Sequence, residues 1–568
     1  MIAWWLACNE GVLERLPPVD QANRVAVSLL GRRPTVAEIT TITEDPGALE
    51  ALVDTWLQDP AFLDTVKDQH AEIYALRSDV LEPLPAVGPL FGNDLMDMSA
   101  ALSESPLELV AWVVAENRPY TELVTTPTVM TNAVHAEVYG LPFDPEGPTW
   151  QTSTWVDGRP SAGLLSDAEL WRRYESAGSN FHRLRAAIVA DRLLCHDLAA
   201  TEVELPTSDL VDEEAVAEAV TTDPACVACH QVLDPLAAVF WGYKNQIKRF
   251  GVVKAFQESC RDFTNGEPAY QSYTPAQYCY PLEQYTPADE GAWATWGLPP
   301  PAYFGAPVAD LAAVGRAIAD DPRFARCTAR QIAAWYHQVP REDVADDLVD
   351  TYTDAFVASG HDFRALTKAI VLDDAFLGLR GPGAVGVLDV RPEQLATLYE
   401  DLVGFTWVGI GDLAECEFPI VDGEGTRCFG PVDLLRSARY GFRAMAGGID
   451  AVTRLTPVHG PTPLKELTLK RLAEEAAATT VYVDLAAPPS ERHLLHLVGP
   501  TTVDEATVRV QLAALHERIL AEPVDPWGPE VTADWGLWKG LFDATGSVQE
   551  AWQTVLTVLF RDARMTFL

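Results

Sequence analysis

Apolar residues recur at helical spacing along most of this chain of 568 residues, and the strict alternation typical of β-strands is scarce. The run PGALEALVDTWLQDPAFLDTV is one example. The stretches 141–160 and 257–304 are rich in Pro, Gly, Tyr or Gln and are expected to form loops. The predicted helical regions are 20–77 with three segments, 100–140, 166–196, and 307–377 with three helices. We therefore expect a mainly α fold.

Helical spacing continues beyond residue 385. The segments are RPEQLATLYEDLVGF, GPVDLLRSARYGFRAM, LKELTLKRLAEEAAATTVYVDL, DEATVRVQLAALHERIL and VQEAWQTVLTVLF. His493 and His496 stand one helical turn apart in ERHLLHL and could bind a metal. A shared amphipathic helix explains this spacing as well, and no acidic or Cys ligand lies nearby, so we expect no metal site here.

The length of the chain exceeds that of one ordinary hydrophobic core, which predicts several packed units. Hydrophobic residues make up 48% and charged residues 22%, as in soluble globular proteins. No run approaches the roughly 18 unbroken apolar residues of a membrane-spanning helix. We expect no transmembrane helix.

Acidic residues outnumber basic residues by 82 to 41, which gives a formal net charge of −41. Such a surface repels nucleic acid and anionic lipid and favours a basic redox or other protein partner. The alternative interpretation is that the charge only keeps an exported protein in solution.

The N-terminus has an apolar run that ends in Leu6-Ala7-Cys8. This resembles the end of a bacterial lipoprotein signal, in which Cys8 would carry the lipid anchor. The run is shorter than an ordinary signal core, and no basic residue precedes it. An apolar tail with a chance Cys is the alternative.

The chain has nine Cys. Setting aside Cys8 as a lipid site and Cys226 and Cys229 for the motif below leaves an even number, as a set of disulfides requires. The proposed pairs are Cys195–Cys327, Cys260–Cys279 and Cys416–Cys428. Other pairings stay open, as does a cytosolic protein with reduced, buried thiols. The disulfides would indicate an oxidising compartment.

The segment Cys226-Val-Ala-Cys229-His230 has the pattern of c-type haem attachment. Two thiols three positions apart reach the two vinyl groups of one porphyrin, and the adjacent His presents a ring nitrogen to the iron. A zinc site would need two further close Cys or His ligands, which the flanks lack. A thioredoxin-like dithiol would need a βαβ frame, whereas these flanks are Pro-bounded loops. One covalent haem c is the favoured interpretation, with His230 as the proximal iron ligand.

The second axial ligand is left open by the sequence. The first Met after the motif, Met445, is more than 200 residues away. Of the alternatives, His182 is the distal candidate, because its helix-like run would pack near the motif if Cys195 is bridged. A five-coordinate iron open to small ligands is the other interpretation. The full set of alternatives is Met130, His182, His196 and His337.

Several motifs in order resemble the multidomain cytochrome c-like proteins of planctomycetes and myxobacteria. They are LLGRRPTVAEITTITEDPGALEALVDTWLQDPAFLD, ENRPYTELVTTPTVMTNAVHAEVYGL, SAGLLSDAELW with RAAIVADRLLC, DPACVACHQVLDPLA, and FARCTARQIAAWYHQVPRED with GHDFRALTKAIVLDDAFLG. The resemblance covers most of 20–380 and does not extend clearly over 390–568. It implies a haem and export rather than a particular reaction. Ala237 replaces the family's Gly after Asp-Pro, and the segment 240–243 also departs from the family pattern.

Together these features predict multi-helix domains packed around a single c-type haem segment, with long disulfide-pinned loops. The leading hypothesis is an exported monohaem cytochrome-like protein of the bacterial periplasm, outer membrane or cell surface that passes single electrons to or from a protein partner. The alternatives are a haem-bearing subunit of an oxidoreductase that acts on a small molecule or polymer, and a non-catalytic surface protein with haem as a structural staple. No catalytic triad order or phosphate-binding loop is present, so catalytic residues stay unknown.

The domain organisation follows from these assignments. The predicted units are 1–19, a candidate lipoprotein signal remnant and tether; 20–140, an N-terminal helical domain; 141–205, a linker loop and helix; 206–380, the haem-binding domain with its closing helices; and 381–568, a C-terminal helical domain of unknown role.

Overall fold

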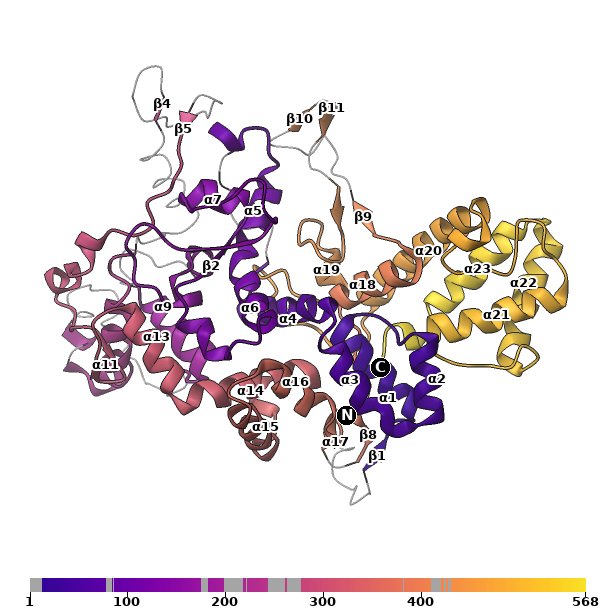
Figure 1. Cartoon of the computed structure of the whole chain (residues 1–568), viewed down its shortest axis with the longest axis horizontal. Helices are drawn as coiled ribbons and strands as arrows, with labels where there is room; N and C mark the ends of the chain where they lie inside the picture. Colours follow the sequence, from indigo (N-terminus) through magenta and orange to yellow (C-terminus); the bar gives the residue numbers. More distant parts are fainter. Residues whose placement is uncertain are drawn as a thin grey trace.

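A computed structural model describes most of the chain, and it confirms that the fold is mainly α. Helices make up 59% of it and strands 5%. The helix that carries the Cys-Val-Ala-Cys-His motif, α11, lies at one end of the long axis, and the bundle of the last helices lies at the other (Figure 1). The described residues are 13–77, 84, 86–174, 182–198, 218–220, 222–243, 261–262, 277–381, 383–409, 420–422, 425–427 and 431–568.

The N-terminal region holds four helices where the sequence predicted three amphipathic segments. They are α1 (Pro18–Leu30), α2 (Val36–Glu44), α3 (Leu49–Trp56) and α4 (Pro60–Ile73). Helix α2 begins with a capping box, since the Thr35 Oγ1 accepts the N–H of Glu38 at 3.2 Å and the Glu38 carboxylate accepts the N–H of Thr35 at 2.6 Å. Gly31 ends α1 with φ +66°, a conformation that favours glycine.

The middle of the chain is also mainly helical, and its helices past residue 307 outnumber the three predicted there. Its helices are α5 (Leu95–Ser103), α6 (Ser105–Ala115), α7 (Ala133–Tyr139), α8 (Ala168–Arg173), α9 (Arg183–Ile188), α11 (Pro224–Ala238), α13 (Leu311–Asp320), α14 (Pro322–His337), α15 (Asp346–Ala358), α16 (Phe363–Val371) and α17 (Asp374–Leu377).

Strands are short and pair in twos, all antiparallel among those described. These pairs therefore connect loop segments and do not form a sheet layer of the fold. The pairs are β1 (Glu14–Arg15) with β8 (Gly378–Arg380), β2 (Val129–Thr131) with β3 (Gln151–Ser153), β4 (Arg261–Asp262) with β5 (Gln277–Tyr278), β6 (Ala302–Tyr303) with β7 (Ala306–Pro307), β9 (Val408–Gly409) with β12 (Val432–Asp433), and β10 (Ile420–Asp422) with β11 (Gly425–Arg427).

The C-terminal part confirms four of its five predicted helices closely and corrects the fifth. The segment GPVDLLRSARYGFRAM is mostly strand β12 and turns, and only its end is helical. Helix α22 was not predicted. The helices are α18 (Pro392–Val403), α19 (Phe442–Met445), α20 (Pro463–Ala486), α21 (Glu505–Leu520), α22 (Pro529–Thr545) and α23 (Val548–Phe560).

The prediction that His493 and His496 share a helix is wrong. Both residues lie in the non-helical segment between α20 and α21. The buried carboxylate of Asp484, near the end of α20, accepts the backbone N–H groups of His493, Leu494 and Leu495 at 2.8 to 2.9 Å. These bonds hold the chain in a turn, because the N–H groups bind the side chain instead of helical carbonyls.

Two large hydrophobic cores organise the described part of the chain. The first draws buried residues from Ala22 to Leu388, and the second draws Val27 and residues from Val390 to Met565. Helix α1 contributes to both, because Val25 packs in the first core and Val27 in the second. The predicted domain boundaries are not tested by this arrangement and stay predictions.

Two buried arginines near α1 join distant parts of the sequence. Arg24 donates to the carbonyl oxygens of Phe376 at 2.7 Å and of Leu568 at 2.8 Å. Arg33 donates to the carbonyl oxygen of Ile519 at 3.1 Å. Burial lowers the pKa of each guanidinium to about 10, so both stay charged at neutral pH. Carbonyl dipoles replace the water that these charges lose on folding.

Among the described residues, no helix combines the length and the apolar character needed to cross a membrane.

Candidate functional site

Helix α11 carries the predicted attachment motif in its first turns. Cys226, Cys229 and His230 lie on one face of the helix, since they occupy positions i, i+3 and i+4. All three side chains are half-buried, and neither cysteine is in a disulfide. The motif is therefore helical, and its three side chains are partly accessible to solvent.

A carboxylate fixes the orientation of the His230 ring. The Nδ1 of His230 lies 3.0 Å from the Oδ1 of Asp234, one turn further along α11. Arg183, the first residue of α9, donates from Nε and Nη2 to the two oxygens of the same carboxylate, at 2.6 and 3.0 Å. The Asp234 side chain is only 6% exposed, whereas that of His230 is 22% exposed. No hydrogen bond to a described residue engages the Nε2 of His230.

The charge of Asp234 determines which ring nitrogen of His230 carries the proton. Burial alone would raise the pKa of Asp234, but the hydrogen bonds from His230 and Arg183 outweigh burial and hold this pKa below its usual value. An ionised carboxylate can only accept, so the Nδ1 of His230 is the donor. The lone pair is left on the Nε2, which is the form of imidazole that binds metals.

The second half of α11 is anchored in the first core. Leu236, Ala237 and Phe240 are fully buried, and the ring of Phe240 meets that of Trp171 edge-on, with centroids 5.0 Å apart. The motif half of the helix is thus held in place by packing of the half that follows it.

Among the described elements, α9 and strand β6 pack most closely against α11. Phe304 at the tip of the β6–β7 hairpin meets the exposed His196 edge-on, with ring centroids 5.4 Å apart. Burial, together with the charge of Asp234, raises the pKa of the Cys229 thiol. A reactive dithiol has a lowered thiol pKa instead, so this environment is not typical of a redox-active cysteine pair.

His182, the predicted distal ligand, precedes α9 and is 2% exposed. Its ring meets that of Trp241 edge-on at 5.5 Å, and its Nδ1 is buried without a hydrogen-bond partner. Burial, and then the charge of Arg185, hold the pKa of His182 well below its usual value, so the imidazole is neutral. Its neighbour Arg183 contacts Asp234 on the Nδ1 side of His230. Ligation of an iron by His182 stays a prediction.

The remaining axial candidates lie in other parts of the fold. Met130 is buried in strand β2, and His337 ends α14 with its ring near those of Tyr352 and Phe376. Burial lowers the pKa of His337 to about 4. Met445 ends α19 in the C-terminal part. Of the four alternatives, His182 contacts Trp241 in the segment that follows α11, and His196 contacts Phe304 in the hairpin that packs against α11.

Some of the cysteines with predicted roles lie within the described residues, and others lie outside them. The predicted Cys195–Cys327 disulfide is confirmed. Cys279 is in a disulfide, and its predicted partner Cys260 lies outside the described residues. The other cysteines with predicted roles that lie outside the described residues are Cys8, Cys416 and Cys428.

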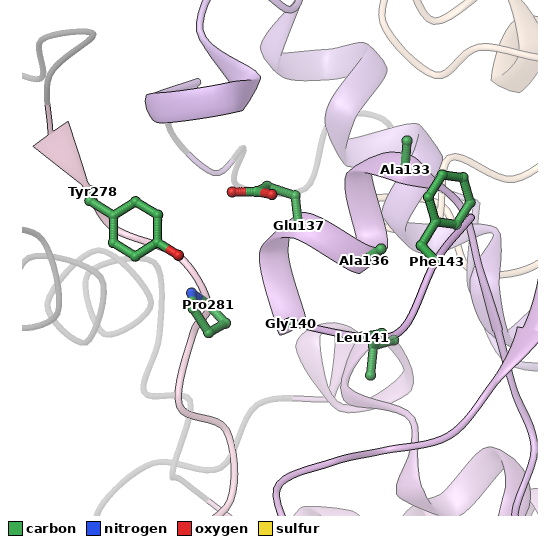
Figure 2. Close-up of a pocket in the computed structure, with 8 residues that line it drawn as sticks. All are labelled: Ala133, Ala136, Glu137, Gly140, Leu141, Phe143, Tyr278 and Pro281. Atoms are coloured by element: carbon green, nitrogen blue, oxygen red, sulfur yellow. The ribbon is translucent and has the colours of Figure 1, made fainter. Parts of the chain in front are cut away.

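A surface cavity of about 370 Å³ lies elsewhere, between α7 and the segment after strand β5. The Glu137 carboxylate and the Tyr278 hydroxyl reach into it from opposite sides, and apolar side chains such as Leu141 and Phe143 line the rest (Figure 2). None of its lining residues belongs to the motif. In the parts of the chain that the structure describes, no group of three or more His, Cys, Asp or Glu side chains is arranged to hold a metal ion.

Asp234 and Arg183 were not predicted from the sequence as site residues. The spacing of Asp234, four positions after His230, is a signal that a helical motif could have provided. Arg183 lies 51 residues before Asp234, and no local pattern relates the two. No protein-family model, curated protein or solved structure matches this chain.

Proposed function

We propose that this protein is an exported, c-type cytochrome-like carrier that binds one haem covalently and exchanges single electrons with a protein partner. The observation that carries the proposal is the motif on α11. Two thiols that form no disulfide lie one helical turn apart, beside a histidine whose Nδ1 is engaged by Asp234. The resemblance of the surrounding segments to cytochrome c-like proteins supports the same conclusion.

The residues of the motif fit a covalent haem. Cys226 and Cys229 would form the thioether links, and His230 would offer its Nε2 to the iron. The haem would supply a one-electron couple. The protein's own contribution is to hold the imidazole with a fixed proton on Nδ1 and to keep the motif at a half-exposed surface.

Zinc and dithiol chemistry are less well supported. A structural zinc site needs four ligands, whereas among the described residues no group of even three His, Cys, Asp or Glu side chains is arranged to hold a metal ion. The raised pKa of the Cys229 thiol, caused first by burial, disfavours a role as an attacking thiolate.

The packing of α11 favours an electron carrier over a haem that serves only as a structural staple. Leu236 and Ala237 at the end of the helix, and Phe240 just after it, already fix this end of α11 in the core. A staple would be needed where the protein itself provides little buried apolar contact, as in very small domains.

Export is supported by the cysteines outside the motif. The Cys195–Cys327 bridge and the bonded Cys279 are typical of a protein that folds in an oxidising compartment, such as the periplasm or the cell surface. The net charge of −41 favours a basic redox partner, because opposite charges accelerate association.

The direct test is expression with a c-type haem maturation system, followed by intact-mass measurement under denaturing conditions. We expect the added mass of one haem, retained after unfolding because the links are covalent. The C226S/C229S variant should lose it. The C195S/C327S variant, which removes two sulfurs outside the motif, is the matched control and should keep it. A wild-type chain without the added mass would contradict the proposal.

A second measurement separates a carrier from an enzyme subunit. For a carrier we expect a sharp low-spin spectrum that carbon monoxide leaves unchanged. Rapid binding of carbon monoxide by the reduced protein would instead favour the alternative of a haem-bearing oxidoreductase subunit.

A further inference from the structure

Three side chains form a hydrogen-bonded series behind the motif. Arg183 of α9 binds Asp234 through two nitrogens, and Asp234 accepts from the Nδ1 of His230. The Asp234 side chain is 6% exposed, and that of Arg183 is 21% exposed. The series therefore connects a buried carboxylate to His230, the motif residue proposed to bind the iron.

The geometry of the series restricts the His230 ring. A bidentate guanidinium contact holds both oxygens of a carboxylate in one plane and so limits its rotation. The Oδ1 that contacts His230 is thereby fixed in position, and the imidazole is held by one hydrogen bond at Nδ1 and by its own helix. The Nε2, on the far side of the ring, is the atom left for a ligand.

We propose that Asp234, held by Arg183, is the positioning residue for His230, and that it makes the imidazole a stronger electron donor towards the iron. This inference rests on the proposed haem. A carboxylate that accepts from the Nδ1 of a metal-bound histidine increases the basicity of the ring, which stabilises the more positive state of the metal. Asp234 would thus lower the reduction potential of the haem.

A purely structural role is the competing explanation. The Arg183–Asp234 ion pair also joins α9 to α11. On this explanation, a variant of either residue would weaken the contact between the two helices and would have no direct effect on the iron. A loosened contact would change stability, but it would not move the iron–histidine bond in a defined direction. The test therefore needs a property of the bond itself.

The experiment compares D234N with wild-type protein loaded with haem. Asn keeps an oxygen that can accept from His230, but it carries no charge. We expect haem attachment to persist and the reduction potential to rise. The iron–histidine stretching band of the reduced protein, recorded by nuclear resonance vibrational spectroscopy of ⁵⁷Fe-labelled haem so that no gas ligand is needed, should move to lower frequency. The R183A variant leaves the carboxylate without its cation, so its potential should move in the opposite direction.

The matched control is D157N. Asp157 also pairs with a buried guanidinium: two nitrogens of Arg159 donate to its carboxylate at 2.5 to 3.1 Å. It has no described contact with His230. This variant should leave the potential and the stretching band unchanged. If D234N does not fold, D234E, which keeps the charge, should retain a band close to that of the wild type.

The outcomes distinguish the two proposals. Wild-type protein without haem would refute the proposed function itself. Haem-loaded D234N with an unchanged potential and an unchanged stretching band would refute the role of Asp234 alone. A shift of the same size in D157N would also refute it, because the effect would then be general to buried charge.

Discussion

Cys195 and Cys327 form a disulfide that joins the turn after α9 to the middle of α14, with their Cα atoms 5.3 Å apart. They are 132 residues apart in the sequence, and the motif lies between them. Cys226 and Cys229, within the closed loop, form no disulfide. In this region the chain thus uses Cys195 and Cys327 for a covalent link and leaves Cys226 and Cys229 for the proposed ligand.

Removal of this disulfide should destabilise the fold. A link across so long a loop restricts the unfolded chain, and we expect the C195A/C327A variant to lose about 2–5 kcal/mol in the free energy of unfolding. Urea denaturation of the oxidised proteins measures the change. Wild-type protein treated with reductant should approach the variant, and equal stability of the oxidised wild type and the variant would contradict the prediction.

The predicted distal ligation by His182 has a spectroscopic consequence. With His182 as the sixth ligand, the H182A variant should change the haem from low-spin to high-spin and allow it to bind carbon monoxide. The control is H196A, which removes the exposed imidazole that contacts Phe304. An unchanged low-spin spectrum in H182A would rule out this ligand.

Asp167 should make stability fall as pH rises. Its carboxylate accepts from the N–H of Glu169 at 2.9 Å and lies 2.9 Å from the Ser105 hydroxyl. Burial, with a smaller effect of the Glu169 charge, raises the pKa of Asp167 to about 7. Between about pH 4 and about pH 7, the unfolded chain has already lost the Asp167 proton, whereas the folded chain still holds it. The folded state must therefore carry a proton that the unfolded state does not, so the free energy of unfolding falls as pH rises through this range.

The D167N variant lacks this titration and keeps both polar contacts. Relative to wild type it should gain about 1–3 kcal/mol in the free energy of unfolding between about pH 5 and about pH 8. The measurement is denaturant unfolding of both proteins at each pH. A difference between them that does not vary with pH would contradict the raised pKa.

Gly31 should tolerate no side chain. Its φ is +66°, and an added Cβ would lie 2.9 Å from the Cβ of Thr397 on α18. We expect G31A to reduce the free energy of unfolding by about 1 kcal/mol or more, from both backbone strain and the close contact. The control is G360A, which has φ +76° and nothing within 4 Å of the added atom, so it measures the strain alone. Equal losses in both variants would show that the contact with Thr397 has no effect.

The helices that the sequence predicted well have a continuous amphipathic pattern, as in α20, α21 and α23. Helix α22 was missed because Gly536 and Gly540 interrupt its pattern, which local propensity disfavours. Its formation depends on tertiary packing, since Trp538 is fully buried and its ring lies 5.8 Å from that of Trp552. The turn at His493 depends on Asp484, nine residues earlier, which helical spacing does not reveal.

The motif residues of the candidate site could be predicted, because covalent attachment of haem requires a local spacing. The helix that presents Cys226 and His230 follows from the same spacing. The contact of Asp234 with Arg183 could not be predicted, since it depends on the packing of α9 against α11. Local chemistry is thus visible in the sequence, whereas the groups that orient it come from the tertiary fold.

The contribution of helix α1 to both hydrophobic cores affects how the molecule unfolds. The helix belongs to the N-terminal half, but its Val27 is buried in the second core, so the C-terminal half expressed alone would lack this part of its interior. Melting of either half should pull this shared helix away from the other. Calorimetry should therefore record one cooperative transition rather than two, even though the chain is long enough for several independent domains.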